Sequence, residues 1–265
     1  MKLWTKFLVG LLIVGGLACL PWMIKNPYYL HIIIMSGIFV LLASSMNLIT
    51  GCTGRLNLGH AAFYGIGAYA STLLVMRLGF PVWLAMFLAG LITIFFGILI
   101  GVPCLKLKGA YLAITTLAFG EITRLAMMNL VGLTNGPLGI RGIPNPPPII
   151  FGGSLAISFE SKTSYYYLLL ALCLVCLLII RRLLSSQIGR TFVAIREDEV
   201  RAETVGIDTT HIKMMNFALG AFFAGLAGAF YAHYVRFISP DTFTLNETFT
   251  ILTMVVIGGL GTFYG

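Results

Sequence analysis

Charged side chains are scarce in this sequence. Asp, Glu, Lys and Arg make up 10% of its 265 residues, and only nine residues are acidic. A soluble domain carries roughly 25% charged residues, because its surface faces water. The composition therefore excludes a soluble globular protein of this size, and lipid has to cover much of the surface.

Motifs for catalysis and for cofactor binding are also missing. The sequence contains no G-x-x-x-x-G-K-[ST] phosphate loop, no H-E-x-x-H and no G-x-S-x-G. Cys173 and Cys176 form a C-x-x-C with helical spacing in an apolar run, without a second pair or a nearby histidine. This context favours apolar filler over a zinc or redox site. We therefore expect no enzyme activity, no metal site and no bound cofactor in this chain.

The basic excess does not indicate nucleic-acid binding. The net charge is +8, from 17 Lys and Arg residues against nine acidic ones. Nucleic-acid binding needs a clustered basic face on a polar domain. Here the cations lie between apolar runs, where the positive-inside rule places them in membrane proteins. We expect a lipid bilayer, and no nucleic acid, as the surrounding of this chain.

Long apolar runs are what the sequence has in abundance. Hydrophobic residues make up 58% of the chain, and the mean hydropathy is +0.96. A bilayer core about 30 Å thick needs roughly 20 apolar residues per helix. The sequence predicts an all-α, polytopic transmembrane bundle that forms a single domain over residues 1–265. We expect about eight spans, at residues 7–24, 28–49, 56–76, 82–105, 110–128, 165–180, 214–235 and 249–264.

The two ends of the chain carry their own predictions. Lys2 and Lys6 precede the first apolar run as in a signal peptide, but the further spans favour an uncleaved first span. At the other end, Gly265 falls inside or at the edge of the last run. We expect a C-terminally incomplete sequence for that reason.

Counting cations gives the orientation. With a cytoplasmic N-terminus, five Lys and Arg residues lie outside and one, Arg124, lies within a span. Eleven lie inside, namely Lys2, Lys6, Arg55, Lys106, Lys108, Arg181, Arg182, Arg190, Arg196, Arg201 and Lys213. This bias agrees with the positive-inside rule.

Two connections between the predicted spans are long. Residues 129–164 are rich in Gly and Pro and predict an irregular external loop. Residues 181–213 are charged, contain no proline and lie on the cytoplasmic side of this topology. Within them a helical stripe predicts an amphipathic surface helix that Gly206 can end, with a second helix starting at Asp208 or Thr209. The stripe consists of Phe192, Ile195, Glu199, Ala202 and Val205.

Polar residues in the predicted spans are the candidates for a transport path. Asn57, His60 and Tyr64 share one helical face in the glycine-rich segment 50–72. Such glycines permit a broken helix around a ligand or close helix packing. Glu121 is the only acidic residue well inside a span. It is either a structural partner of Arg124, three residues later, or a part of the transport path.

Small residues repeat at four-residue intervals in the span 214–235. Such ladders let helix backbones approach closely in membranes. We predict helix packing from Gly220, Ala224 and Gly228 and from Ala221, Gly225 and Ala229, and this pattern says nothing about the substrate.

Nearly everything after the first span resembles one family. The matching stretches are 50–71 (TGCTGRLNLGHAAFYGIGAYAS), 105–122 (LKLKGAYLAITTLAFGEI), 133–143 (LTNGPLGIRGI), 189–208 (GRTFVAIREDEVRAETVGID), 221–243 and 254–265 (MVVIGGLGTFYG). They resemble the membrane permease subunits of branched-chain amino acid ABC importers, of the LivM/LivH type and closer to LivM. Family members usually continue through another hydrophobic segment.

The resemblance implies a set of partners. Such a permease pairs with a second permease, two cytoplasmic ABC ATPase subunits that bind ATP-Mg, and a periplasmic amino-acid-binding protein. It places the chain in the bacterial inner membrane. Segment 189–208 resembles the segment that docks on an ATPase, although Thr204 and Val205 stand where the general E-A-A…G signature has two alanines. The docking candidates are Arg196, Glu197, Glu199, Arg201, Glu203 and Gly206.

Alternatives remain open at this point. Relatives within the family move urea or short amides instead of Leu, Ile or Val. A secondary transporter coupled to an ion gradient would also contain broken, glycine-rich spans, although it ordinarily has more intramembrane carboxylates. A membrane enzyme is a distant third reading, because the sequence offers no catalytic set.

Overall fold

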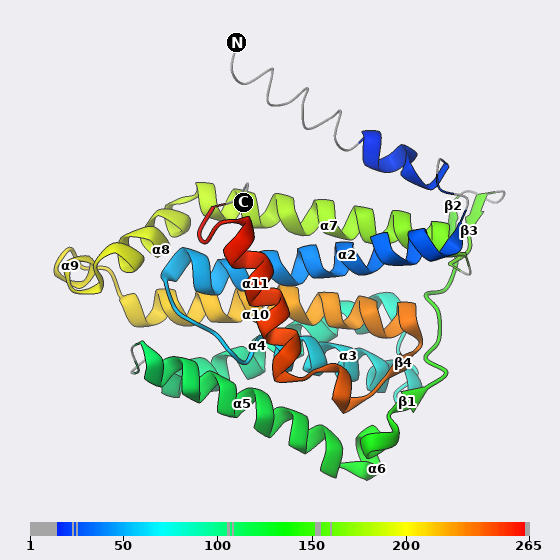
Figure 1. The fold of residues 1–265 in the computed structure, drawn as a ribbon, viewed down its shortest axis with the longest axis horizontal. Coiled ribbons are helices and arrows are strands. Elements are labelled where there is room, and N and C mark those ends of the chain that lie inside the picture. Colours follow the sequence, from blue (N-terminus) through cyan, green and yellow to red (C-terminus); the bar gives the residue numbers. More distant parts are fainter. Residues whose placement is uncertain are drawn as a thin grey trace.

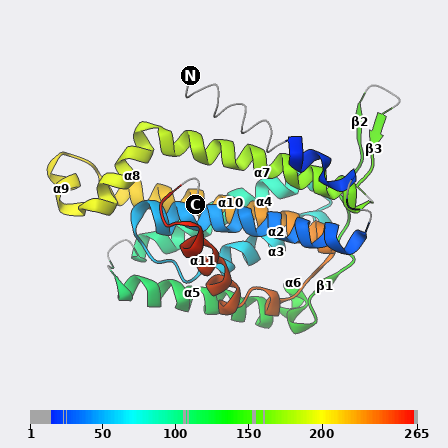
Figure 2. The same ribbon diagram turned by 45° about the horizontal axis from the view of Figure 1, so that its top comes forward.

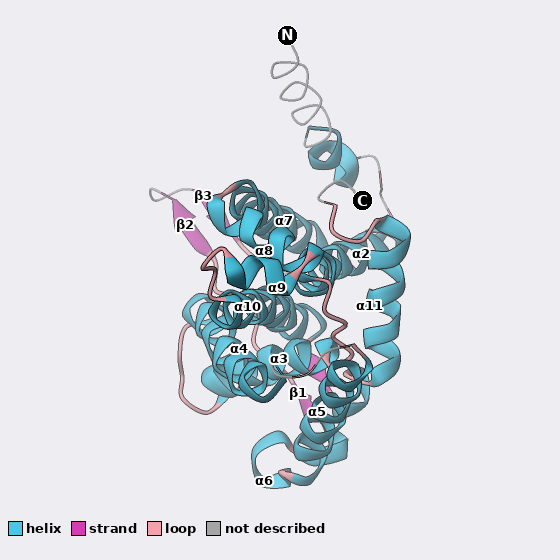
Figure 3. Ribbon diagram, turned by 90° about the vertical axis from the view of Figure 1, so that its left-hand side faces the viewer, coloured by secondary structure: helices cyan, strands magenta, loops and turns pink. Residues whose placement is uncertain are grey.

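The long helices run side by side along the longest axis of the molecule (Figure 1). The computed structural model describes residues 15–22, 24, 26–104, 107, 109–151, 155–159 and 161–262. The long helices are α2 (Pro27–Met46), α3 (His60–Met76), α4 (Val82–Cys104), α5 (Ala110–Asn129), α7 (Lys162–Ser185) and α10 (Thr209–Val235). A shorter helix, α11 (Leu245–Gly258), follows, and residues 15–22 are also helical. Seen from the end, α10 lies in the middle of the bundle, where it packs mainly on α3 and α4 and then on α2 (Figure 3).

The connections gather at two opposite ends (Figure 2). One end, called here the α8–α9 end, carries a π-helix (Asn47–Gly51), α8 (Gln187–Glu197) and α9 (Glu199–Thr204). The other, called the β-strand end, carries α6 (Val131–Thr134), two 3-10 turns (Gly136–Leu138 and Pro240–Thr242) and four short strands, β1 (Ile140–Arg141), β2 (Ile149–Phe151), β3 (Leu155–Ile157) and β4 (Phe237–Ile238). The predicted inside segments around Arg55 and 181–213 share the α8–α9 end with Leu107, since Arg55 bonds both Leu107 O and Glu199.

Four helices among the described residues are long and apolar enough to cross a bilayer, at Pro27–Gly51, Val82–Cys104, Lys162–Ser185 and Thr209–Val235. The all-α fold is as predicted, but the count of eight spans is not confirmed. Predicted spans 56–76 and 249–264 are shorter helices, α3 and α11, of 17 and 14 residues. At 1.5 Å per residue they are about 26 and 21 Å long, less than a 30 Å bilayer core. Half of predicted span 7–24 lies outside the described residues.

An exposed apolar stripe on α4 gives the bundle a lipid-facing surface. Phe87, Leu91, Phe95 and Leu99 recur every four residues, and each is more than 40% exposed. Residues four apart lie on one face of a helix. Such a contiguous apolar stripe, with a buried opposite face of Ala85, Ala89 and Gly97, is what a helix at the lipid boundary requires.

Local capping explains the charged connection 181–213. Ser186 caps α8, and Asp198 caps α9 by accepting from the amides of Val200 and Arg201. Asp208 caps α10, as predicted, by accepting from the amide of His211. Because Asp198 has extended backbone, the single predicted amphipathic helix is two helices.

The predicted helical stripe places one of its residues, Val205, on the wrong side. Phe192, Ile195 and Ala202 are buried, but Val205 is 80% exposed. The stripe assumes one continuous helix, and the change of direction at Asp198 turns the end of α9 away from the bundle. Gly206 follows with φ +87°, a conformation that suits glycine and ends α9.

The connection 129–164 is less irregular than predicted. Arg77, at the end of α3, donates to the carbonyls of Gly132 and Leu133. Strand β1 pairs antiparallel with β4, with Ile140 opposite Ile238, and β2 pairs with β3 as a hairpin. These contacts tie the connection to the ends of α3 and α10 at the β-strand end.

The small residues of α10 lie where backbones meet. A Cβ at Gly228 would overlap the carbonyl of Tyr64 in α3, and one at Gly225 would overlap the side chain of Thr93 in α4. One at Gly220 would overlap Ile49, and Ala224 is fully buried. The ladders therefore bring α3 and α4 against adjacent faces of α10 within this chain.

We expect the variant Gly225→Ala to lower the free energy of unfolding by about 1–3 kcal/mol, because the added methyl overpacks against Thr93. Thermal unfolding of the purified chain in detergent measures the effect. Gly101→Ala is the matched control, since its Cβ would lie 3.9 Å from Met214 Cγ, an ordinary contact. Equal stability of the two variants would contradict this account of the packing.

Candidate functional site

The start of α3 is a break in the helical bundle. The helical chain continues from the π-helix to Thr53, and a non-helical stretch, residues 54–59, precedes the start of α3 at His60. Side chains satisfy the free amides of this stretch. Leu58 N donates to Thr116 Oγ1 in α5, Gly59 N to Asn57 Oδ1 and Ala61 N to Thr248 Oγ1 in α11, each at 3.0 Å. Two other helices therefore hold the start of α3 inside the bundle, where no water would pair it.

Glycine is required at this crossing. A Cβ at Gly59 would overlap the carbonyl of Thr116, and a Cβ at Gly120 would lie 3.3 Å from Gly59 Cα. The backbones of α3 and α5 consequently approach each other at the break. The glycine-rich segment 50–72 thus forms both structures that the sequence permits, a broken helix and close packing.

The structure brings Asn57 and His60 together. His60 Nε2 lies 2.8 Å from Ser45 Oγ in α2, and His60 Nδ1 lies 3.4 Å from Asn57 Nδ2. His60 is completely buried, and Asn57 is 1% exposed. Tyr64 is buried one turn later, where its ring contacts those of Tyr231 and Phe243. All three side chains point into the bundle and find partners there.

A cavity of about 200 Å³ lies against the break. Its wall comes from the start of α3, the middle of α5, the turn before α11 and the start of α11, and Asn57, His60 and Tyr64 are not among its lining residues. The lining residues are Leu58, Ala61, Ala62, Leu117, Gly120, Glu121, Phe243, Thr244, Leu245 and Thr248. The predicted segment therefore reaches the cavity through its small and backbone groups, and not through the polar side chains singled out from the sequence.

Glu121 is the charged group of this cavity. Arg124 Nε lies 3.1 Å from both Glu121 carboxylate oxygens, and Arg124 Nη2 lies 2.5 Å from Oε1. Asp241, in the turn before α11, lies 3.7 Å from Arg124 Nη1. The Glu121 side chain is 43% exposed, so its charge is both paired and accessible from the cavity side. The two readings of Glu121, a structural pair and a path residue, are compatible in this geometry.

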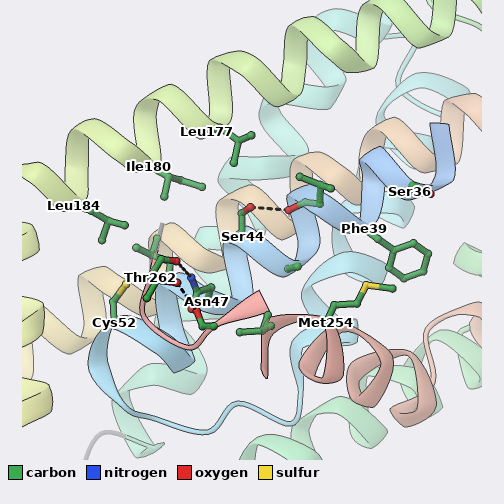
Figure 4. Close-up of a pocket in the computed structure, with 15 residues that line it drawn as sticks. Ser36, Phe39, Ser44, Asn47, Cys52, Leu177, Ile180, Leu184, Met254 and Thr262 are labelled. Carbon is green, nitrogen blue, oxygen red and sulfur yellow. Dashed lines mark hydrogen bonds between the residues drawn. The ribbon is translucent and has the colours of Figure 1, made fainter. Parts of the chain in front are cut away.

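A larger groove of about 380 Å³ lies between α2, α7 and residues 254–262 (Figure 4). Its lining is mainly aliphatic, with Leu177, Ile180 and Leu184 from α7. Its hydroxyls are already bonded to their own helix, since Ser36 donates to Ile32 O and Ser44 to Val40 O. The smaller cavity is the better candidate site, because it combines an accessible carboxylate with a helix break.

At the α8–α9 end, Glu199 joins three parts of the chain. Its Oε1 lies 2.5 Å from Nζ of Lys213 in α10, and its Oε2 lies 3.1 Å from Nη2 of Arg55. The Lys213 side chain is 2% exposed and that of Arg55 is 8% exposed. We call these three residues the charge clamp. Glu199, predicted as a docking residue, faces the bundle and anchors α9 to it.

The other docking candidates lie on the outer side of this end. Glu197 is exposed, and the Arg201 side chain is 87% exposed beside Asp198. Glu203 is exposed but accepts from Thr209 Oγ1 at 2.7 Å. Arg196 differs, because its Nη1 donates to the carbonyl of Gly51 at 2.8 Å.

Sequence reasoning missed four residues that shape these sites: Arg55, Thr116, Lys213 and Thr248. Their partners lie in other elements of the fold: Lys213 and Glu199 are 14 positions apart, and Thr248 and Ala61 are 187 positions apart. No local spacing indicates such pairs. For metals, the described residues contain no group of three or more His, Cys, Asp and Glu side chains that could hold an ion.

The four apolar helices, the broken α3 and the cavity beside it define a polytopic helical membrane protein with a candidate path for a small solute. Comparison with known families makes the class specific. Residues 28–265 match the family described as branched-chain amino acid transport system / permease component, and the chain belongs to it.

Curated relatives agree with this family. The chain is 37% identical to the high-affinity branched-chain amino acid transport system permease protein LivM of Salmonella typhimurium and 36% identical to that of Escherichia coli K12, over 96% of its own length. It spans 63% of the length of each. A probable LivM permease of Methanocaldococcus jannaschii is 26% identical over 87% of this chain and 74% of the relative. LivH of Escherichia coli K12 is less similar, with 22% identity. No solved structure matches the chain.

Proposed function

We propose that this chain is the membrane-spanning permease subunit of an ATP-driven importer for Leu, Ile or Val. Its family and its LivM relatives support this substrate class. In this proposal it pairs with a second permease and two cytoplasmic ATPases that bind ATP-Mg, and it receives substrate from a periplasmic amino-acid-binding protein. It is a multi-pass protein of the bacterial inner membrane, with the N-terminus and the α8–α9 end in the cytoplasm.

The observation that carries the proposal is the cavity at the broken start of α3. Broken helices turn backbone groups toward a solute near the middle of a bilayer in many transporters. Here the cavity offers apolar walls from Leu58, Leu117 and Phe243, beside the hydroxyl of Thr244 and the carboxylate of Glu121. Such a lining suits a small amino acid with an aliphatic side chain and a charged head group.

The α8–α9 end is the ATPase-docking surface in this proposal. Val193, Val200 and Val205 are 48%, 62% and 80% exposed, although this end carries the charged segment. Glu197, Arg201 and Glu203 surround them. Apolar residues within a polar rim are the usual anatomy of a protein interface. Together with the charge clamp, which fixes α9 to the bundle, this surface can receive a force and pass it on.

Coexpression with the neighbouring ATPase, second-permease and binding-protein subunits tests the function. We expect the chain to co-purify with them, and proteoliposomes of the complex to accumulate radiolabelled leucine only when ATP is enclosed. If the complex takes up urea and not Leu, Ile or Val, the proposed substrate class is wrong. If uptake occurs without the ATPase partners and stops when an ion gradient is abolished, the energy source is the ion gradient and not ATP.

The cavity makes a separate prediction. We expect Leu117→Trp to reduce ATP-dependent leucine uptake at least tenfold, because the larger ring fills the cavity that Leu117 lines. Uptake by proteoliposomes that contain equal amounts of complex measures it. Ile114→Trp is the matched control on the same helix, since Ile114 is 63% exposed and lies outside the cavity. Equal uptake by the two variants would show that the cavity is not part of the transport path.

A further inference from the structure

Arg196 occupies a position unlike that of the other charged residues of α8 and α9. It lies near the end of α8, and its Nη1 donates to the carbonyl of Gly51, the last residue of the π-helix. A Cβ at Gly261 would overlap the guanidinium group, and one at Gly54 would lie 3.3 Å from Arg196 Cγ. Two glycines from distant segments therefore make room for this one side chain, and a third, Gly51, accepts its hydrogen bond.

The π-helix that Arg196 contacts is held by side chains from several elements. Asn47, its first residue, donates from Nδ2 to Thr262 O and accepts at Oδ1 from Gly261 N, both at 2.8 Å. Figure 4 shows Asn47 turned toward Thr262. From α10, Asn216 Nδ2 donates to Leu48 O at 2.8 Å. The π-helix is thus the meeting point of α8, α10 and the segment after α11.

Two features of the π-helix indicate that its hydrogen bonds can rearrange. A π-helix is rare and occurs often at functional sites, because its wider turn disturbs the regular hydrogen-bond ladder. Among the described residues, three buried side-chain polar atoms have no hydrogen-bond partner, and two of them, Thr50 Oγ1 and Asn216 Oδ1, lie here. Buried polar groups are almost always paired, so this turn holds unused bonding capacity.

The charge clamp and Arg196 connect α8 and α9 to different parts of the bundle. Glu199 ties α9 to α10 through Lys213 and to the segment before α3 through Arg55. Arg196, three residues earlier, reaches the π-helix instead. Of these two polar contacts between the α8–α9 unit and the bundle, the one made by Arg196 is the contact with the π-helix at the end of α2.

We infer that Arg196 is a positioning residue that couples movement of α8 to the π-helix Asn47–Gly51, and through segment 52–59 to the start of α3 and its cavity. The inference rests on the proposed function, because the movement comes from ATPases docked on α8 and α9. Displacement of α8 pulls on the Gly51 carbonyl, and the next residues along the chain lead directly to the broken helix. His60, the first residue of α3, also contacts Ser45, which lies just before the π-helix. The π-helix and the start of α3 are therefore connected by a side-chain hydrogen bond as well as by the chain.

The test compares transport with ATP hydrolysis in the full complex, reconstituted in proteoliposomes. We expect Arg196→Gln to keep at least half of the ATPase activity stimulated by the binding protein while leucine uptake falls at least tenfold. The number of substrate molecules moved per ATP then falls by a similar factor, and Arg196→Lys restores part of it. Arg190→Gln is the control, since Arg190 is an exposed residue of the same helix α8 and is not one of the residues assigned to the docking surface. It should keep the wild-type ratio.

A second variant approaches the same contact from the other side. Gly51→Ala leaves the docking surface unchanged, but its Cβ would overlap Asn47 Oδ1 and Gly261 N. We expect the same loss of substrate moved per ATP, and no further loss in the double variant, because neighbours in one network are not additive. If Gly51→Ala keeps the wild-type ratio, or if Arg196→Gln loses ATPase activity and uptake in equal proportion, the inference is wrong.

Hydrogen exchange separates this inference from the proposed function. In the purified chain alone, Arg196→Gln should speed amide exchange across residues 47–59, whereas Arg190→Gln should not. If the wild-type complex shows no ATP-dependent uptake but exchange changes as expected, the proposed function fails and the contact between α8 and the π-helix stands. Unchanged exchange in Arg196→Gln would overturn the inference even where transport is ATP-driven.

Discussion

Replacing Glu199 with glutamine is expected to destabilise the protein by about 3 kcal/mol and to release α9 from the bundle. The carboxylate pairs with Lys213 and Arg55, whose side chains are only 2% and 8% exposed. Removing one partner of a buried ion pair leaves the other charge without compensation, which costs about 3–5 kcal/mol. Thermal unfolding in detergent measures the loss, and limited proteolysis within residues 197–208 reports the release of α9.

Glu197→Gln serves as the control for this result. It removes the same charge two residues away, from an exposed position, and should leave stability and proteolysis unchanged. The double variant Glu199→Leu with Lys213→Leu should recover part of the lost stability, because apolar replacements of a buried pair are often tolerated. If Glu199→Gln were no less stable than Glu197→Gln, the charge clamp would not hold α9.

The second large effect is expected at Val205. Val205→Asp should weaken co-purification of the ATPase subunits at least tenfold while the chain itself stays folded. The side chain is 80% exposed, so a carboxylate costs the isolated chain little, but in an apolar contact it has to be desolvated. A tenfold loss corresponds to about 1.4 kcal/mol of binding free energy. Affinity purification of the complex from detergent extracts, quantified against the wild type, measures it.

Val205→Thr is the matched control, because it keeps the shape of the side chain and adds no charge. Both variants avoid Gly206, whose φ of +87° would strain any other residue and mix a backbone effect into the result. Equal recovery of ATPase with Val205→Asp and Val205→Thr would place the docking surface elsewhere on the chain.

Much of the fold was predictable because it depends on local pattern. The apolar runs at 28–49, 82–105, 165–180 and 214–235 coincide with the four candidate spans to within a few residues, since lipid imposes length and composition on each helix independently. The cap at Asp208 and the chain reversal at Gly206 were also readable, because capping needs only neighbouring residues.

Prediction failed where an element depends on distant partners. The sequence gives no reason for α3 to begin at His60, because Thr116 and Thr248, which pair its free amides, lie in α5 and α11. Likewise the helical stripe of 192–205 placed Val205 inward, since the break at Asp198 changes which face looks at the bundle. In both cases tertiary contacts override the helical period.

The sequence by itself determined a lipid-embedded, all-helical chain with one charged connection exposed to water, because too few of its side chains can face a polar solvent. Only the tertiary structure decided which groups work together. In the folded protein Asn57, His60 and Tyr64 are buried inside the bundle. Glu199 pairs with Lys213 and so attaches α9 to α10, and Arg196 binds the π-helix. The reason is physical: solvent preference is a property of each segment alone, whereas a hydrogen bond or an ion pair exists only after packing has brought its two halves within about 3 Å.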